Sequence, residues 1–195
     1  MCIRDRPAQV VELTPQFSRT LDECINDRMQ RLHAYQDQAY AERYRRLVER
    51  VRAAEATLQL GDALTQQVAR SYAKLLAYKD EYEVARLHTQ TGFEKKIAAM
   101  FSGDYRLVYH LAPPLLSRPT AEGGASKKYA FGPWVRGVFH VLARLKFLRG
   151  TAFDVFGYTD ERRTERALIG AYENDIALIL QNLRAETHAL AINIA

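Results

Sequence analysis

The sequence lacks the features that mark most cofactor-binding and membrane proteins. Only two cysteines, Cys2 and Cys24, occur among 195 residues, and they form no C-x-x-C pair, so neither a disulfide scaffold nor an iron–sulfur or zinc site is supported. No apolar run approaches the roughly 20 residues of a membrane-spanning helix, and no secretory signal peptide is recognisable. We therefore expect a cytoplasmic protein with no membrane partner.

Catalytic motifs are missing as well. The sequence contains no G-x-G-x-x-G, no P-loop, no G-x-S-x-G and no H-E-x-x-H. Its five histidines are too dispersed to predict a metal site. His110, which stands on an alternating stretch just before a double proline, ranks first among them as a candidate functional residue.

What is present is typical of a folded globular chain. Hydrophobic residues make up 48% and charged residues 26%, with a modest net charge of +5. Five arginines gather in Arg43–Arg52, on a predicted helix. A solvated face, or a docking face for an acidic partner, explains them better than nucleic-acid binding, which we rank third. We expect no nucleic-acid partner.

Hydrophobic periodicity predicts a mainly α fold, an irregular helical domain built on long helices with at most a small two- or three-stranded β element. The predicted helices lie near residues 20–58, 63–89, 93–101, 134–149, 160–183 and 185–194. The first is either one long helix or two helices nearly end to end. Tyr105–Leu111 alternates as a strand does, and Val10–Leu13 and Lys128–Phe131 are its candidate partners.

The central stretch, Leu64–Thr89, contains no glycine or proline and is predicted to form one unbroken helix. Its second half crowds charges against aromatic rings, and the candidate polar cluster consists of Lys79, Asp80, Glu83, Arg86 and His110. Such groups could supply shifted pKa values for acid–base chemistry. A structural role is favoured, with Lys79/Glu83 and Tyr82/Arg86 as pairs one helical turn apart.

Two further expectations concern this cluster. Lys79 and Glu83 should lie at the edge of the core, where Lys79 needs a carboxylate partner. If the apolar side of the strand packs on the central helix, His110 should point away from the core, towards a docking surface.

The sequence pattern divides the chain into three parts. Residues 1–6 join no periodic pattern and are typical of a stray leader, and residues 7–19 are typical of a linker. Residues 20–195 are the helical domain.

Several long strings carry a family resemblance. They lie in Leu32–Val51, Ala73–Thr89, Phe93–Leu116 and Phe131–Ile169, and include KDEYEVAR, HLAPPLL and FGYTDERR. From about Leu21 to Ala195, the sequence resembles the C-terminal region of the large, fused bacterial indolepyruvate ferredoxin oxidoreductases, a domain of unknown function.

The resemblance implies that residues 20–195 are the C-terminal part of a larger enzyme, truncated at both ends. This parent enzyme would belong to the 2-oxoacid:ferredoxin oxidoreductase family. Such enzymes use thiamine diphosphate with Mg²⁺ to decarboxylate an arylpyruvate onto coenzyme A, and pass electrons through iron–sulfur clusters to ferredoxin. These parts would lie in the upstream catalytic domains of the same polypeptide, so this segment should hold no cofactor or catalytic residue and should be inactive alone. Whether the parent is a homodimer stays open.

Two functions remain as alternatives. In the first, the segment is a non-catalytic domain that packs on the enzyme body and supports assembly or access to the active site. In the second, Lys79–Arg86 and His110 form a ligand-binding module for an anion such as coenzyme A or a carboxylate.

Overall fold

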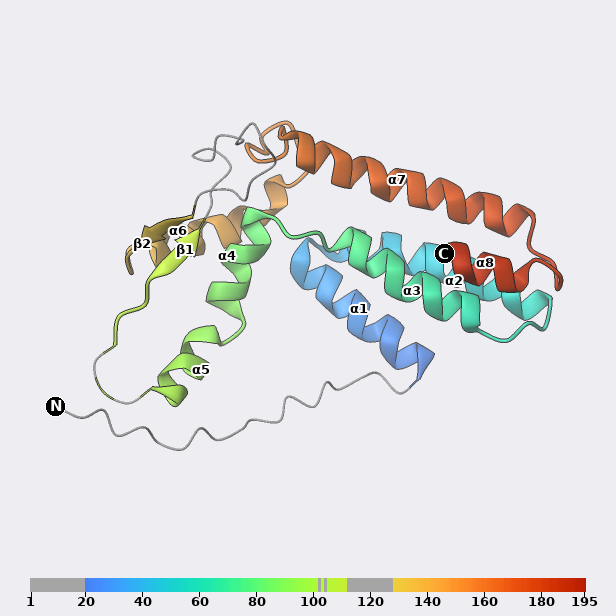
Figure 1. The fold of residues 1–195 in the computed structure, drawn as a ribbon, viewed down its shortest axis with the longest axis horizontal. Helices are drawn as coiled ribbons and strands as arrows, with labels where there is room; N and C mark the ends of the chain where they lie inside the picture. The colour runs from blue at the N-terminus through green and yellow to red at the C-terminus, as the bar shows by residue number, and fades with distance from the viewer. Residues whose placement is uncertain (1–19, 102, 104, 112–127) are drawn as a thin grey trace.

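The computed structural model describes residues 20–101, 103, 105–111 and 128–195. Within these residues the chain forms eight α-helices, one short 3-10 helix and two strands, which confirms the mainly α fold (Figure 1). The predicted leader, the linker and the candidate strand Val10–Leu13 lie outside the described residues. No described helix combines the length and apolar character needed to cross a bilayer.

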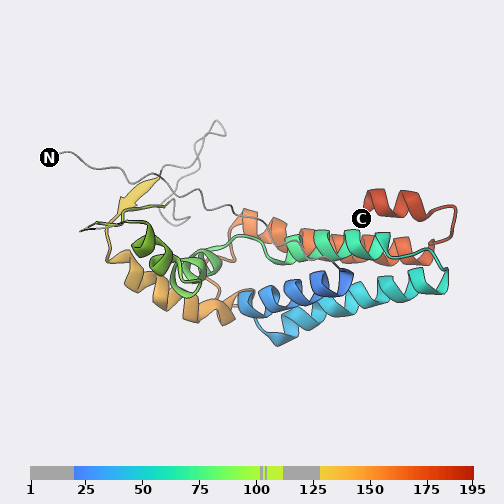
Figure 2. The same ribbon diagram turned by 90° about the horizontal axis from the view of Figure 1, so that it is seen from below.

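Five helices pack as a bundle around the larger of two hydrophobic cores. They are α1 (Leu21–Tyr35), α2 (Gln38–Thr57), α3 (Ala63–Leu76), α7 (Asp160–Gln181) and α8 (His188–Ile194). Figures 1 and 2 show them running alternately up and down along the longest axis of the molecule. The largest fully buried side chains of this core include Tyr44, Tyr72 and Leu64.

The first predicted helix is a helical hairpin. Helix α1 begins at a capping box in which the Thr20 hydroxyl accepts from the amide of Glu23 and the Glu23 carboxylate accepts from the amide of Thr20. The chain then turns at Gln36 and Asp37, where the Asp37 side chain caps the amide of Tyr40. Helices α1 and α2 therefore pack side by side (Figure 2), and both predicted arrangements, one helix or two nearly end to end, are wrong.

The prediction of an unbroken central helix is also wrong. Helix α3 ends at Leu76, and α4 (Glu81–Gln90) begins after Asp80, whose backbone is extended and whose side chain accepts from the amide of Glu83 at 2.8 Å. Asp80 therefore acts as an N-cap, not as a residue of a helix interior. An aspartate followed three residues later by a glutamate is a helix-start pattern that periodicity alone does not reveal.

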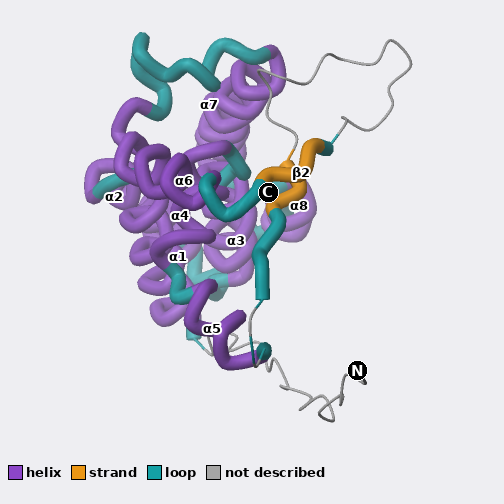
Figure 3. The backbone as a smooth tube through the Cα atoms, turned by 90° about the vertical axis from the view of Figure 1, so that its left-hand side faces the viewer, coloured by secondary structure: helices purple, strands orange, loops and turns teal. Residues whose placement is uncertain are grey.

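A second, smaller core lies at the other end of the molecule. Helix α4 packs against α6 (Val135–Arg144), with α5 (Phe93–Met100) and the strands β1 (Tyr109–Leu111) and β2 (Tyr129–Phe131) beside them. The buried residues of this core are Ala85, Tyr109, Val135, Phe139 and Ala143. Figure 3 faces this end of the molecule and shows the strands at the edge of the helical fold.

The strands confirm one expected pairing. β1 and β2 are antiparallel, with Tyr109 opposite Phe131, so the segment near Lys128–Phe131 is the partner of the strand. The strand is shorter than the predicted Tyr105–Leu111. Tyr109 is buried on the core side and His110 is exposed, as the alternation predicts.

The predicted helix 134–149 differs in detail from its observed structure. Helix α6 ends at Arg144 and continues as the 3-10 helix η1 (Leu145–Leu148) before Gly150, whose φ of 75° suits the left-handed turn there. Val138, in the first half of α6, is 43% exposed although it is apolar.

Candidate functional site

The turn between α3 and α4 is the point where the two cores are joined. Asp80 forms an ion pair there with Arg149, which follows η1, and the two side chains are 3% and 4% exposed. Arg149 donates from Nη2 to Oδ1 of Asp80 at 2.9 Å and from Nε to Oδ2. The pair is thus bidentate and shielded from water, the arrangement that favours arginine over lysine.

Arg149 also holds the end of α1. Its Nη1 atom donates to the backbone carbonyl of Tyr35 and to the Gln36 side chain, both at 2.7 Å, and its guanidinium lies 3.7 Å from the centre of the Tyr35 ring. Burial lowers the pKa of Arg149, but the hydrogen bond to Asp80 and the neighbouring charges outweigh burial and raise it. One cation therefore ties α1, α4 and the turn after η1 together.

Two tyrosines complete the broken end of α3. The Tyr40 hydroxyl donates to the carbonyl of Leu76, and the Tyr35 hydroxyl donates to the carbonyl of Tyr78, both at 2.9 Å. Carbonyls at a helix C-terminus have no partner within the helix, so these hydroxyls satisfy groups that the break exposes. Burial is the main cause that raises the pKa of each phenol well above its usual range.

A second buried carboxylate organises the aromatic loop that follows Gly150. Asp154 is 3% exposed and accepts from the amides of Gly150 at 2.8 Å and Gly157 at 3.1 Å. It also accepts from the Tyr82 hydroxyl at 3.2 Å, and the Tyr82 ring meets Phe156 edge to face. Asp154 therefore fixes the loop against α4.

The predicted polar cluster is only partly assembled. Glu83 and Arg86 form a bidentate pair, with both hydrogen bonds at 2.7 Å and side chains 14% and 16% exposed. This hydrogen bond is the first cause of the raised pKa of Arg86. Glu83 thus lies at the edge of the core as predicted, although its partner is Arg86 and not Lys79.

The remaining cluster predictions need correction. Lys79 stands in the turn before α4, is exposed, and makes no ion pair with any described residue, so the expected Lys79/Glu83 pair is absent. The Tyr82/Arg86 pair is also absent, because the Tyr82 hydroxyl is bonded to Asp154. His110 is on β1, apart from the helix start that holds Asp80, and it has no described polar contact.

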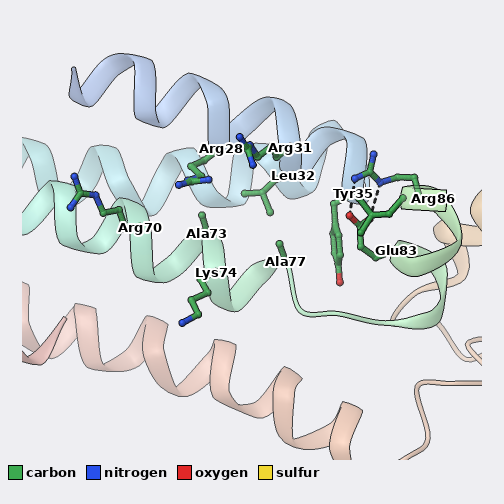
Figure 4. A pocket seen from close by; sticks show the side chains of 11 residues that line it. Arg28, Arg31, Leu32, Tyr35, Arg70, Ala73, Lys74, Ala77, Glu83 and Arg86 are labelled. Atoms are coloured by element: carbon green, nitrogen blue, oxygen red, sulfur yellow. Dashed lines mark hydrogen bonds and ion pairs between the residues drawn. The ribbon is translucent and has the colours of Figure 1, made fainter. Parts of the chain in front are cut away.

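The Glu83–Arg86 pair closes one end of a groove of about 470 Å³ between α1, α3 and α4 (Figure 4). Its lining carries five cationic side chains, and its remaining residues are apolar except for Glu83 and the Tyr35 hydroxyl. The cations are Arg28, Arg31, Arg70, Lys74 and Arg86. Nothing in the periodicity of the sequence points to this groove, because its walls come from three separate helices.

Comparison with known proteins places the chain in a family. Residues 21–195 match the family described as "Family of unknown function (DUF6537)". The chain belongs to this family. No curated protein matches it, and no solved structure does. The match spans both cores, so the bundle and the smaller cluster are together part of the DUF6537 family domain.

Two more carboxylates in this DUF6537 chain, one buried and one half-buried, were not predicted. Glu55, 0% exposed, accepts from the amides of Leu64 and Thr65 at 2.9 and 2.7 Å and from the Thr65 hydroxyl, so it caps α3 from the neighbouring helix. Its Oε1 atom lies 2.7 Å from Nε2 of His188. Glu173 is the other, and it receives the Tyr72 hydroxyl and a bidentate Arg43.

The arginine face of α2 is largely neutralised by neighbours. Arg43 pairs with Glu173, Arg45 with Glu42 and Arg52 with Asp22. An interface with nucleic acid needs cations that are free to meet phosphates, so this pairing counts against the third-ranked function. Among the described residues, no group of three or more His, Cys, Asp or Glu side chains gathers as a metal ion would require.

An apolar stripe is exposed on α6. Trp134, Val138 and Val141 follow a spacing of 4 and 3 residues, which places them on one face of the helix, and they are 65%, 43% and 56% exposed. The opposite face carries Val135, Phe139 and Ala143 into the smaller core. Helix α6 is therefore apolar on two faces, and only one of them is covered by the described residues.

Proposed function

We propose that this chain is the non-catalytic C-terminal segment of an indolepyruvate (arylpyruvate) ferredoxin oxidoreductase, and that it packs on the thiamine-diphosphate and iron–sulfur body of that enzyme. Its role there is to support assembly or access to the active site. The family assignment of the parent enzyme rests on the resemblance carried by KDEYEVAR, HLAPPLL and FGYTDERR.

The observation that supports docking is the exposed stripe of Trp134, Val138 and Val141. Scattered apolar residues are normal on protein surfaces, but an aligned row of three on one helix face is typical of an interaction site. An aromatic residue at the start of such a row is a common anchor in interfaces. We assign this face of α6 to the contact with the catalytic body.

The neighbouring buried network suits a docking role. Helix α6 leads into η1 and Arg149, and Arg149 donates to the carbonyl of Tyr35, the last residue of α1, at 2.7 Å. Lys146, also in η1, donates to the carbonyl of Ala34 at 2.7 Å. The stripe is therefore presented on a support that is fastened to α1 at two points.

The test is co-purification with the upstream catalytic domains of a related oxidoreductase, expressed as a separate chain. The 195-residue chain should bind them, and Val141→Asp should abolish binding because it places a charge in an apolar contact. Leu178→Asp, on an exposed position of α7, is the matched control and should bind normally. Circular dichroism checks that both variants keep the helical fold.

The outcomes are decisive in both directions. Loss of binding in Val141→Asp alone supports docking through α6, and an accompanying fall in indolepyruvate-dependent viologen reduction by the complex supports a role in activity. Equal binding of the two variants, or no binding of the unmodified chain, would reject the proposal. A dimer of the isolated chain that Val141→Asp dissociates would assign the stripe to self-association instead.

The structure reduces the set of residues that the ligand-binding alternative could use. Lys79 and His110 take no part in a common site with Glu83 and Arg86, and Asp80 is occupied by Arg149. Glu83 and Arg86 are the members of the predicted cluster that line the cationic groove. That groove is the observation that keeps an anion-binding function open.

A further inference from the structure

The groove between α1 and α3 is hollow because of the side chains that α3 presents there. Ala73 and Ala77, one turn apart, face Leu32 and Tyr35 of α1, so no large side chain fills the space (Figure 4). The resulting volume of about 470 Å³ lies within the ordinary range of small-molecule sites. Its floor is apolar and its rim is charged.

The charges of the rim are strongly unequal. Five cationic side chains line the groove, and Glu83 is its one lining carboxylate among the described residues. Asp27, which is on α1 itself, partly neutralises two of the cations, with distances of 3.5 Å to Arg28 and 2.9 Å to Arg31. The groove therefore keeps an excess of positive charge.

Two of the cations are available to a ligand. Arg70 and Lys74 are exposed on α3 and form no ion pair with any described residue. Arg86, at the α4 end of the groove, is held in place by its bidentate bonds to Glu83. The surroundings of this end are also cationic. Burial is the main cause that lowers the pKa of Lys146, and the positive charges of Arg86 and Arg149 lower it further.

The spacing of the cations indicates the kind of anion. Arg28 and Arg31 are one turn apart on α1, and Arg70 and Lys74 are one turn apart on α3, so each wall carries a row about 5–6 Å long. Two such rows suit a chain of linked phosphates better than a single carboxylate. Guanidinium groups also match phosphate oxygens in a bidentate manner.

We propose that the groove lined by Arg28, Arg31, Arg70, Lys74 and Arg86 binds a phosphorylated organic anion, with the phosphates between the two cationic rows and an apolar part on the Ala73–Ala77 floor. This function is distinct from docking through α6 and does not depend on it. The two sites share no residue, so each can fail while the other holds.

Isothermal titration calorimetry on the 195-residue chain at low salt tests the proposal with pyrophosphate, ATP and citrate as probes. Pyrophosphate and ATP should bind saturably at one site, with ATP tighter because its apolar part reaches the floor. Affinity should fall as salt is added. No saturable binding of either phosphate, or citrate binding as tightly as pyrophosphate, would overturn the assignment.

Variants locate the site. The double variant Arg70→Gln/Lys74→Gln should weaken pyrophosphate binding by at least about ten-fold, since two charge-assisted hydrogen bonds are lost. Arg46→Gln/Arg50→Gln removes the same charge from exposed positions of α2 and is the matched control. Equal losses in the two double variants would mean that only net charge matters, and would overturn the site.

Ala77→Leu gives an independent check, because it fills the groove without changing its charge. This variant should bind ATP no more tightly than pyrophosphate. If it still binds ATP more tightly, the apolar floor does not contribute to binding. Each variant is first compared with the unmodified chain by circular dichroism and by its urea midpoint.

Discussion

Asp80, in the turn before α4, and Arg149, in the turn after η1, form an ion pair with side chains that are 3% and 4% exposed. Removing one partner of such a pair leaves a buried charge without compensation, at a cost of about 3–5 kcal/mol. Asp80→Leu should therefore lower the free energy of unfolding by about that amount, and the urea midpoint measures it.

Substitutions of two neighbouring charged residues, Lys79 and Glu83, serve as comparisons for Asp80→Leu. Lys79→Met should leave the urea midpoint unchanged, because Lys79 is exposed and unpaired among the described residues. The loss of stability in Glu83→Leu should be intermediate between those of Asp80→Leu and Lys79→Met. This substitution leaves Arg86 unpaired at the edge of the groove, where water can still reach the guanidinium. Small, equal shifts for all three variants would show that the Asp80–Arg149 pair does not hold the turn.

A double variant separates the ion pair from the other roles of its members. Asp80→Leu/Arg149→Met removes both charges, and buried pairs replaced by apolar residues often lose little stability. The double variant should therefore be destabilised by less than the sum of the two single variants, with a coupling of about 1–3 kcal/mol. The remaining loss reflects the N-cap of α4 and the bond to the carbonyl of Tyr35. Simple additivity would contradict the pairing.

Acid should weaken the bundle through Glu55. Burial raises the pKa of Glu55, but the hydrogen bonds from Thr65, His188 and the backbone outweigh burial, so the pKa lies below its usual value of 4.5. A carboxyl group with a lowered pKa contributes stability that is present above pH 4.5 and is lost as the pH falls through the folded-state value.

The variant Glu55→Gln tests the direction of this pH dependence of stability. It should cost about 1–3 kcal/mol at pH 7, because a neutral amide cannot accept all of these hydrogen bonds, and the difference from the unmodified chain should shrink towards about pH 3. Thermal melts between neutral and acidic pH measure it. Glu49→Gln, on the exposed side of the same helix, is the control. A constant difference at every pH would contradict the assignment.

The tyrosine caps of α3 predict a local effect. Tyr40→Phe removes the donor to the carbonyl of Leu76 and should lower the free energy of unfolding by about 1 kcal/mol. Amide hydrogen exchange in the last turn of α3 should accelerate more than in α8. Tyr105→Phe, an exposed position, serves as the control. Uniform acceleration throughout the bundle would show a general loss of packing instead.

The helices could largely be predicted because their apolar stripes are local signals. Asp160–Gln181 and Phe93–Met100 agree closely with the predicted ranges, and Thr20 and Thr159 were recognisable as caps. The breaks at Gln36–Asp37 and Ala77–Asp80 were missed because neither contains glycine or proline. In both turns an aspartate caps the following helix, and that side-chain signal decides where the helix begins.

The site was harder to predict, for a physical reason. Glu83 and Arg86 are neighbours on one helix, so spacing alone suggests that they interact. Asp80 and Arg149 meet only after the two cores have formed, and the groove needs α1, α3 and α4 together. Long-range partners of this kind leave no periodic trace in a single sequence.

The break after Leu76 also defines the topology of the chain. The bundle is built from residues on either side of a long excursion, which leaves α3 at Ala77 and returns at Asp160 to the same end of the bundle (Figure 1). The smaller core is thus an insertion into the five-helix bundle. Changes in the length or surface of this insertion need not disturb the packing of the bundle helices. The part of the molecule that carries the α6 stripe can therefore diversify among relatives while the bundle keeps its packing.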